Sequence, residues 1–165
     1  MQKYFLFIFL IMGRSLFGQV QEPKTPFELN ETLAGISDSL YTIGVNWGNA
    51  FNEANQSGDF SAIKTVRVSL EKYIDTKITY VSNMKDVKNS KAFRLAILDF
   101  LNYEKSFCDD GLKPFENLDS KSSDADKKKL LDQLTPILSK EENLLKAIAV
   151  VQKKYAEENG FTIQE

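Results

Sequence analysis

The feature that most constrains this chain is the spacing of its apolar residues, which recur every three or four positions from residue 26 to residue 158. This period matches the 3.6 residues per turn of an α-helix, whereas a half-buried strand alternates apolar and polar residues. Glycine and proline are few, so only short polar stretches interrupt the pattern. The sequence predicts four helices, at about 26–56, 60–87, 90–119 and 124–158.

Local signals mark the ends of these helices. "TPFE" at 25–28 has the form of a capping box, with Thr25 as the N-cap and Glu28 three residues later. Ser123 and Asp126 repeat that arrangement before the fourth helix. Gly160 suits the left-handed position that ends many helices. Helix starts and stops are therefore expected at these positions.

The short connections force neighbouring helices to run antiparallel. The fold class that follows is all-α, an antiparallel up-down-up-down four-helix bundle formed by residues 19–165. Pro114 predicts a kink late in the third helix, and Pro136 predicts a disturbance early in the fourth, because proline lacks a backbone donor.

Residues 1–18 have the three parts of a cleavable secretory signal. Lys3 supplies the positive start, the run from Tyr4 to Met12 is apolar, and small residues follow. The run is too short for a membrane span, which needs about 20 apolar residues. Cleavage after Gly18 is preferred, and cleavage after Ser15 is the alternative.

The predicted export and the amino-acid composition exclude several classes of binding partner. No cysteine follows either cleavage position, so no lipid anchor is expected, and no membrane span remains after cleavage. Loss of Lys3 and Arg14 with the signal leaves 19 basic and 23 acidic residues. A mildly acidic chain lacks the basic face that nucleic-acid binding requires. We expect an exported protein of the periplasm, the outer surface or the extracellular medium.

Cys108 is the only cysteine, so no disulfide forms within the chain. It falls on an apolar helical face, which indicates a small buried hydrophobic residue rather than a reactive thiol.

Two charged residues stand in the middle of apolar stripes. Glu104 lies within "FRLAILDFLNYEKSF" at 93–107, and Glu141 holds the same place in the fourth helix. Reflection through the connection between these helices brings the two carboxylates to one level, with Tyr73 near it and Lys77 one turn away. Four outcomes stay open: a shared proton, a bound cation, side chains that reach water, or neutralisation by Lys77 with Tyr73 donating a hydrogen bond. The candidate ligand-binding residues are Glu104, Glu141, Tyr73 and Lys77.

Metal and catalytic chemistry are disfavoured by residue type. The chain has no histidine, and the residues three after Glu104 and Glu141 are Phe107 and Leu144. This excludes the usual di-metal carboxylate site of helical bundles and any histidine-based nucleophilic mechanism. We expect no metal, no cofactor and no enzymatic activity.

Aromatic residues at helical spacing in the third run are most simply core residues. Small residues near the same faces, together with the two prolines, keep open an alternative, a core cavity for a small apolar ligand. The small residues are Gly44, Ala50, Gly111 and Ala147.

The combination of a signal, four helices, "KAFRLAILDFLNYEKSF" in the third helix and the tail "VQKKYAEENGFTIQE" resembles a family of small bacterial envelope or surface proteins of unknown function. The family is named for leptospiral surface proteins and also occurs in other Gram-negative lineages. The resemblance implies export and a helical fold, and it transfers no functional residue. Some members look like lipoproteins, but this chain lacks the cysteine for such an anchor.

These observations predict an exported, non-enzymatic helical bundle of the cell envelope, a structural or interaction module with an unknown envelope protein as partner. The alternative is a carrier or sensor that binds a small apolar ligand or a cation inside the bundle.

Overall fold

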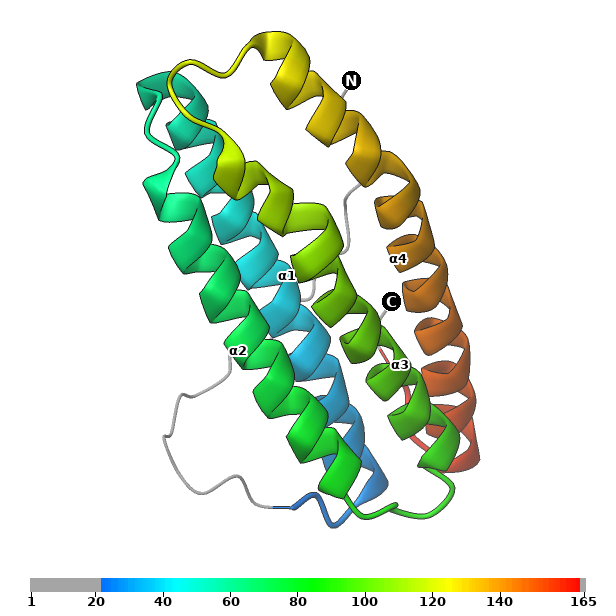
Figure 1. The fold of residues 1–165 in the computed structure, drawn as a ribbon. Helices are drawn as coiled ribbons and strands as arrows, with labels where there is room; N and C mark the ends of the chain where they lie inside the picture. Colours follow the sequence, from blue (N-terminus) through cyan, green and yellow to red (C-terminus); the bar gives the residue numbers. More distant parts are fainter. Residues whose placement is uncertain (1–21, 164–165) are drawn as a thin grey trace.

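Four long helices run alternately up and down, as the apolar periodicity predicts (Figure 1). The computed structural model describes residues 22–163. The helices are α1 (Pro26–Ser57), α2 (Ser61–Asn83), α3 (Lys91–Phe107) and α4 (Asp124–Glu158). The all-α four-helix bundle is confirmed. The predicted signal at 1–18 and its cleavage sites lie outside the described residues.

The two predicted capping boxes are present. The Glu28 backbone N–H donates to Thr25 Oγ1 at 3.2 Å at the start of α1. The Asp126 backbone N–H donates to Ser123 Oγ at 3.2 Å at the start of α4. Each cap satisfies a backbone donor that the first helical turn leaves without a partner. Local sequence thus defines where both of the longest helices begin.

The predicted stripes meet in one core. Buried residues of α1, α2 and α3 recur at helical spacing, and an aromatic group closes the core where α1 ends. There the Phe115 ring lies edge-on to Trp47 and to Phe51, with centroids 5.3 and 5.1 Å apart. Cys108 is fully buried, which confirms its expected place in the core.

The third helix differs from the single run predicted at 90–119. The α-helix ends at Phe107 and continues as a π-helical turn, η1 (Cys108–Leu112), and a 3₁₀ turn, η2 (Lys113–Asn117). Pro114 lies at the start of η2 and cannot donate a backbone hydrogen bond, so the widened turn precedes it. The predicted kink is therefore a change of helix type.

The second helix ends at Asn83, four residues before the predicted end at 87. Side chains in the following connection explain the early stop, because they bind the backbone and each other outside the helix. Ser90 Oγ accepts a hydrogen bond from the Val87 N–H at 2.9 Å, and Arg94 Nε donates to Asp86 at 2.7 Å. Ser90 directly precedes α3, but its side chain binds the preceding turn instead of capping the helix.

Pro136 does not interrupt α4, which runs continuously from Asp124 to Glu158. Figure 1 shows α4 as the curved helix of the bundle. A proline within a helix commonly produces bending of this kind.

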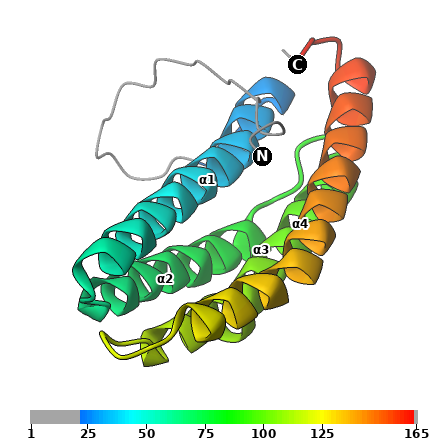
Figure 2. The ribbon, with the colours of Figure 1, turned by 90° about the horizontal axis from the view of Figure 1, so that it is seen from above.

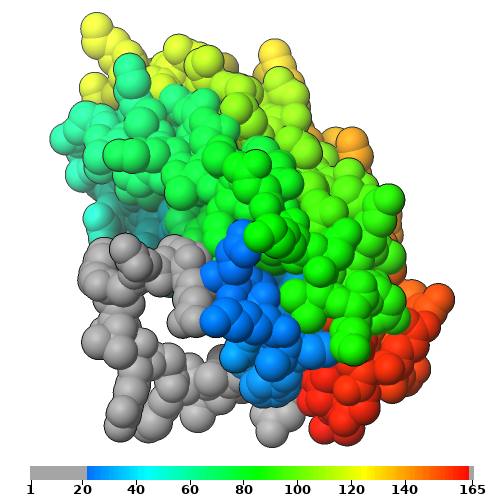
Figure 3. All heavy atoms as spheres, turned by 90° about the horizontal axis from the view of Figure 1, so that it is seen from below, coloured from blue at the N-terminus to red at the C-terminus, as the bar shows by residue number. Residues whose placement is uncertain are grey.

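The first described residues, the α2–α3 connection and the chain's C-terminal residues gather at one end of the molecule (Figure 3). Tyr155 donates its hydroxyl to the Val87 carbonyl at 3.0 Å, and the Phe161 ring lies edge-on to Phe27. Gly160 has φ +73°, as expected for the residue that ends α4. These contacts bring the two ends of the described chain together.

Away from that end, α1 and α4 are in much looser contact than the other neighbouring helices. α1 packs on α2, α2 on α3 and α3 on α4, whereas α1 and α4 approach each other at far fewer positions. Figure 2 shows α1 and α4 as the two outer members of this series. Within residues 22–163, no helix is both long and apolar enough to cross a membrane.

Candidate functional site

Glu104 lies in the middle of the buried face of α3, as the sequence predicts. Its side chain belongs to a residue that is only 5% exposed, and its Oε1 atom has no hydrogen-bond partner among the described residues. Burial, and to a smaller extent the charge of Glu141, raise the pKa of this carboxyl to about 8. Glu104 is therefore a neutral acid at neutral pH, and no group within residues 22–163 binds its Oε1 atom.

Glu141 is the second member of the predicted pair and comes from α4. It is half-buried, and burial raises the pKa of its carboxyl. Its charge acts on Glu104, so the two acids lie within electrostatic reach across the α3–α4 contact. Two facing acids of raised pKa can share a proton or accept a cation that displaces it.

Tyr103 lies beside this pair and fixes the local contact of α3 with α4. Its hydroxyl donates to the Ile137 carbonyl at 2.6 Å, and Lys140 Nζ lies 4.8 Å from its ring centroid. Burial and then the charges of Glu104 and Glu141 raise the Tyr103 pKa. The nearest cation of α4 is thus held over an aromatic ring instead of between the two acids.

The structure does not bring Tyr73 and Lys77 to the two glutamates. Lys77 Nζ lies 5.2 Å from the Tyr73 ring centroid and 5.7 Å from that of Tyr80. Burial raises the Tyr73 pKa, and Ser39 and Asp38 of α1 also act on it. Tyr73 and Lys77 therefore belong to the contact of α2 with α1, and among the described residues no ion pair joins Lys77 to Glu104.

The predicted height of this part of α2 along the bundle nevertheless agrees with the structure. Lys105, next to Glu104, pairs with Asp75 of α2 at 2.6 Å, which places that part of α2 beside that part of α3. The direction around α2 was wrong, because Asp75 faces α3 while Tyr73, two residues earlier, faces α1. Connection lengths predict height along a bundle, but the rotation of each helix depends on all its neighbours.

Sequence reasoning missed a second buried charge, Arg67 of α2. It is 5% exposed and its guanidinium binds two carboxylates, Glu71 on the next turn at 3.0 Å and Glu116 of η2. Burial alone lowers the Arg67 pKa, but the hydrogen bonds and charges of the two glutamates outweigh it and raise the pKa. Arg67 stands between Ile63 and Leu70 in its stripe, which is the same signal that revealed Glu104.

The structure gives no support to the cavity expected near the small residues. Phe107 fills the space over Gly111, where an added Cβ would lie 2.3 Å from the ring, and Gly44 is exposed with nothing within 4 Å of such an atom. The best-formed hollows of the described chain lie on the surface instead.

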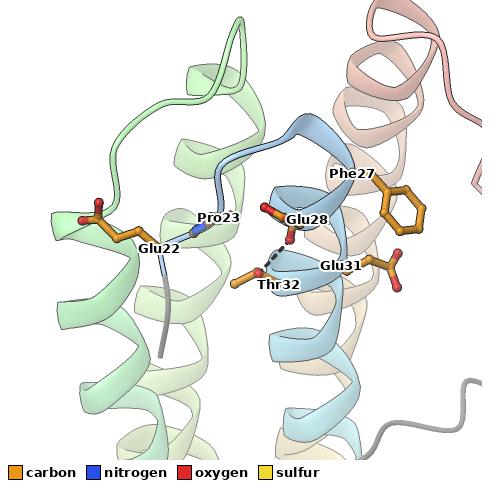
Figure 4. A pocket seen from close by; sticks show the side chains of 6 residues that line it. All are labelled: Glu22, Pro23, Phe27, Glu28, Glu31 and Thr32. Carbon is orange, nitrogen blue, oxygen red and sulfur yellow. Dashed lines mark hydrogen bonds between the residues drawn. The ribbon is translucent and has the colours of Figure 1, made fainter. Parts of the chain in front are cut away.

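One surface hollow, of about 360 Å³, lies at the start of α1 (Figure 4). Three glutamates line it with Phe27, but Figure 4 shows their carboxylates pointing in different directions. Glu28 already caps α1 by accepting hydrogen bonds from the backbone N–H groups of Lys24 and Thr25. The acids therefore do not form a binding constellation.

The other hollow, of about 680 Å³, lies between the α1–α2 turn and the segment that follows η2. Polar residues of both connections line much of it, including Asp59, Lys64 and Glu116. Since Glu116 is bound to Arg67, this hollow offers no free charged group from the core. In the part of the chain that the structure describes, no group of three or more potential metal ligands is close enough to hold an ion.

The face of α4 that meets α1 carries exposed apolar residues, Leu131 and Leu138, on both sides of Gln133 and towards Glu141. Gln152 donates to Asn30 of α1 at 2.9 Å near one end of the bundle. The residues 7, 14 and 21 positions before Gln152 are Leu145, Leu138 and Leu131, which share its face. Leu138 is 48% exposed and Leu131 is 44% exposed, so α1 does not cover them.

Three small residues and one exposed aromatic residue, Tyr41, occupy the matching face of α1. Positions 7, 14 and 18 after Asn30 are Ser37, Gly44 and Gly48, and nothing lies within 4 Å of a Cβ added at either glycine. Glu141 lies 11 positions before Gln152, on the same face as the leucines. We define the α1/α4 seam as Leu131, Leu138, Glu141 and Leu145 of α4 with Ser37, Gly44 and Gly48 of α1.

Comparison with known proteins adds no family to this description. No protein family, curated protein or solved structure matches the chain. The function must therefore be argued from the fold, the two acids and the seam.

Proposed function

We propose that this chain is an exported, non-enzymatic helical bundle of the bacterial cell envelope that acts as an interaction module through its α1/α4 seam. The observation that carries the proposal is the exposure of apolar residues along α4. α4 buries four residues over its length, whereas the slightly shorter α1 buries eight. Apolar residues that stay exposed together on one face of a soluble domain commonly mark a partner surface.

Export is supported by the sequence of residues 1–18, which has the parts of a cleavable signal. The resemblance to small envelope proteins of unknown function agrees with it and implies no reaction. The periplasm, the outer surface and the extracellular medium all fit the proposal.

Export is tested by expressing the full chain in a Gram-negative host and sequencing the N-terminus of the product in each cell fraction. We expect a product outside the cytoplasm that begins at Gln19, or at Leu16 if cleavage follows Ser15. A product that stays in the cytoplasm and begins at Met1 would contradict the proposal.

The role of the seam is tested by photo-crosslinking in the same cells. A photoreactive amino acid at Leu138 should give a discrete adduct with one protein, which mass spectrometry identifies. The same amino acid at Val68, an equally exposed apolar residue of α2, is the matched control and should give none. Equal adducts at both positions would show that the seam has no special role.

A second candidate function is a carrier that holds a cation in the bundle. The buried Glu104 oxygen without a partner favours it. Native mass spectrometry of residues 19–165 before and after denaturation decides between the two functions. A bound mass that leaves on denaturation and is missing in Glu104→Gln supports the carrier, and a bare protein mass supports the interaction module.

A further inference from the structure

We propose that the α1/α4 seam docks an amphipathic helix of a partner protein, and that a lysine or arginine at the centre of its apolar face pairs with Glu141 and Glu104. The inference rests on the proposed function, because it gives the partner chemistry for the same surface.

The spacing of apolar residues along α4 matches the contact face of a helix partner. Leu131, Leu138 and Leu145 repeat every seven residues, with Leu134, Glu141 and Ile148 three residues after each. This is the heptad pattern with which one helix receives another. The core side of the pattern includes Leu134 and Ile148, which are buried, while Leu131 and Leu138 on the outer side remain exposed. The core of the bundle thus covers one side of this heptad face, and the other side is free to contact a further helix.

The opposite wall of the seam permits close approach at its two glycines, which follow Tyr41 along α1. Gly44 and Gly48 of α1 carry no side chain, and the space above both is open. Glycines at such positions let another backbone approach closely. From Leu131 to Leu145 the seam is about 21 Å long at 1.5 Å per residue, which is the length of four helical turns.

The acidic residues at the seam favour a partner helix that carries a basic residue. Glu141 lies on the seam and acts electrostatically on Glu104, whose Oε1 atom has no partner within residues 22–163. The buried cation of α2, Arg67, is bound to Glu71 and Glu116. A basic side chain from outside the chain would pair with the Glu141 carboxylate and, once Glu104 has lost its proton, with the Glu104 carboxylate as well.

The same charges disfavour a second copy of this chain as the occupant. A twofold dimer brings the same surface of each copy together, so the seam of one copy would face the seam of the other. The Glu141 carboxylates of both copies would then lie in the same interface. Like charges at an interface oppose association, and a basic partner avoids this cost.

Proton linkage follows from the pairing. Glu104 holds a proton below its pKa of about 8, and a cation favours the charged carboxylate, so docking releases that proton. Affinity should therefore rise between pH 6 and pH 8, by at most about tenfold per pH unit for one proton. Of the charged groups around Glu104, Glu141 is the one whose charge shifts its pKa. Other titratable groups on the packed elements include Tyr103, Lys105 and Cys108 on α3, Lys140 on α4, Arg67, Glu71, Asp75 and Lys77 on α2, and Asp38 beside Tyr73 on α1.

The experiment uses two synthetic amphipathic helices of three heptads that differ at one position. One carries arginine at the centre of a leucine face, and the other carries norleucine there. Their affinities for residues 19–165 are measured by fluorescence polarisation at pH 6 and pH 8. We expect the arginine helix to bind at least about tenfold more tightly at pH 8, and the ratio to shrink at pH 6.

Variants locate the effect. Glu104→Gln and Glu141→Gln should each reduce the preference for arginine to below about threefold. Glu142→Gln is the matched control, because Glu142 is an exposed neighbour that pairs with Lys146, and it should keep the full preference. Circular dichroism confirms that each variant folds, and Leu138→Ser should weaken both helices, unlike Val68→Ser.

Several results would overturn the proposal. They are equal binding of the two helices, binding of neither, and an arginine preference that survives Glu104→Gln and Glu141→Gln together. A dimer of the chain that excludes the helices would make a second copy the occupant. The outcome is independent of export: a cytoplasmic product with an arginine preference would contradict the proposed function alone.

Discussion

At Arg67 a buried guanidinium lies between two carboxylates, whereas at Glu104 a buried carboxyl faces another acid. Both residues are 5% exposed, and both stand in the apolar stripe of their helix. Arg67 is held by Glu71 and Glu116, so its charge is balanced within the chain. Glu104 has an oxygen without a partner among the described residues and a pKa raised to about 8.

This difference separates two uses of buried charge. A balanced cluster has its desolvation cost offset by the groups that surround it, and here it ties α2 to the 3₁₀ turn η2. A pair of acids without a cation has no such offset, so its desolvation cost remains in the isolated protein. A ligand or partner of opposite charge can lower that cost. The first region therefore holds the fold together, and the second is the better candidate for function.

The largest expected effect comes from breaking the balanced cluster. Arg67→Met removes the cation and leaves Glu116, whose side chain is 15% exposed, without its partner. We expect the free energy of unfolding to fall by about 2–4 kcal/mol, measured by urea denaturation. Lys105→Met is the control, since its pair with Asp75 is about half exposed on both sides, and it should cost clearly less stability than Arg67→Met. Equal losses in the two variants would place Arg67 with ordinary surface pairs.

A slightly smaller effect is expected from the π turn that brings Glu116 to Arg67. In Gly111→Ala the new Cβ would lie 2.3 and 2.5 Å from two atoms of the Phe107 ring, so the ring or the turn must move. The expected cost is about 1–3 kcal/mol, measured by thermal and urea unfolding. Gly44→Ala is the matched control, because its Cβ meets nothing within 4 Å and should stabilise α1 by up to about 1 kcal/mol. A neutral Gly111→Ala variant would show that the turn adapts freely.

Replacing Glu104, the buried member of the Glu104–Glu141 pair, should raise the stability of the protein instead of lowering it. The folded-state pKa of Glu104 is raised, so the folded protein binds the proton more tightly and loses stability as pH rises from about 4.5 to about 8. The slope is at most about 1.4 kcal/mol per pH unit. Glu104→Gln removes that slope, and at pH 8 it should stabilise the protein by about 1–2 kcal/mol, because the amide is neutral but leaves its N–H unpaired.

Denaturation curves at pH 5, 6, 7 and 8 measure this difference. Glu142→Gln, one residue from Glu141 and exposed, should keep the pH slope of the natural sequence. A destabilised Glu104→Gln protein at pH 8 would mean that the carboxylate is satisfied in solution.

The smallest expected effect is that of Glu141→Gln, which separates the two causes of the raised Glu104 pKa. Glu141→Gln removes the neighbouring charge but leaves burial, which is the larger cause. The pKa of Glu104 should therefore fall by about one unit or less, which is about 1.4 kcal/mol or less, and stay above 4.5. Carbon-13 NMR titration of the Glu104 carboxyl measures it. A pKa that returns to 4.5 would assign the whole shift to the pair.

Much of the fold could be predicted because its signals are local. Thr25 and Ser123 cap the helices that follow them, and the apolar period identifies the four helices. Cys108 and Glu104 were predicted in the core from the same period, and both are buried there. Caps and stripes depend on residues within a few turns, so a single sequence carries them.

The rest depends on how the helices turn toward one another. Tyr73 and Lys77 stand at the predicted level but face α1, because the rotation of α2 is set by its contacts with both α1 and α3. Glu116 pairs with Arg67 from η2, which follows the π turn, and the wider π turn changes the rotation of the chain after Phe107. Neither rotation can be read from the spacing of one stripe.

The buried Cys108 makes the seam directly measurable. Burial raises its thiol pKa to about 12, so at pH 7.5 the thiol is almost entirely protonated and the reactive thiolate is scarce. Cysteines introduced in place of Gly44 and Leu138 can then carry spin labels in the otherwise natural sequence, with Cys108 left unlabelled. The distance between the labels would report the opening of α1 and α4, with and without a bound helix, on a protein that needs no background substitution.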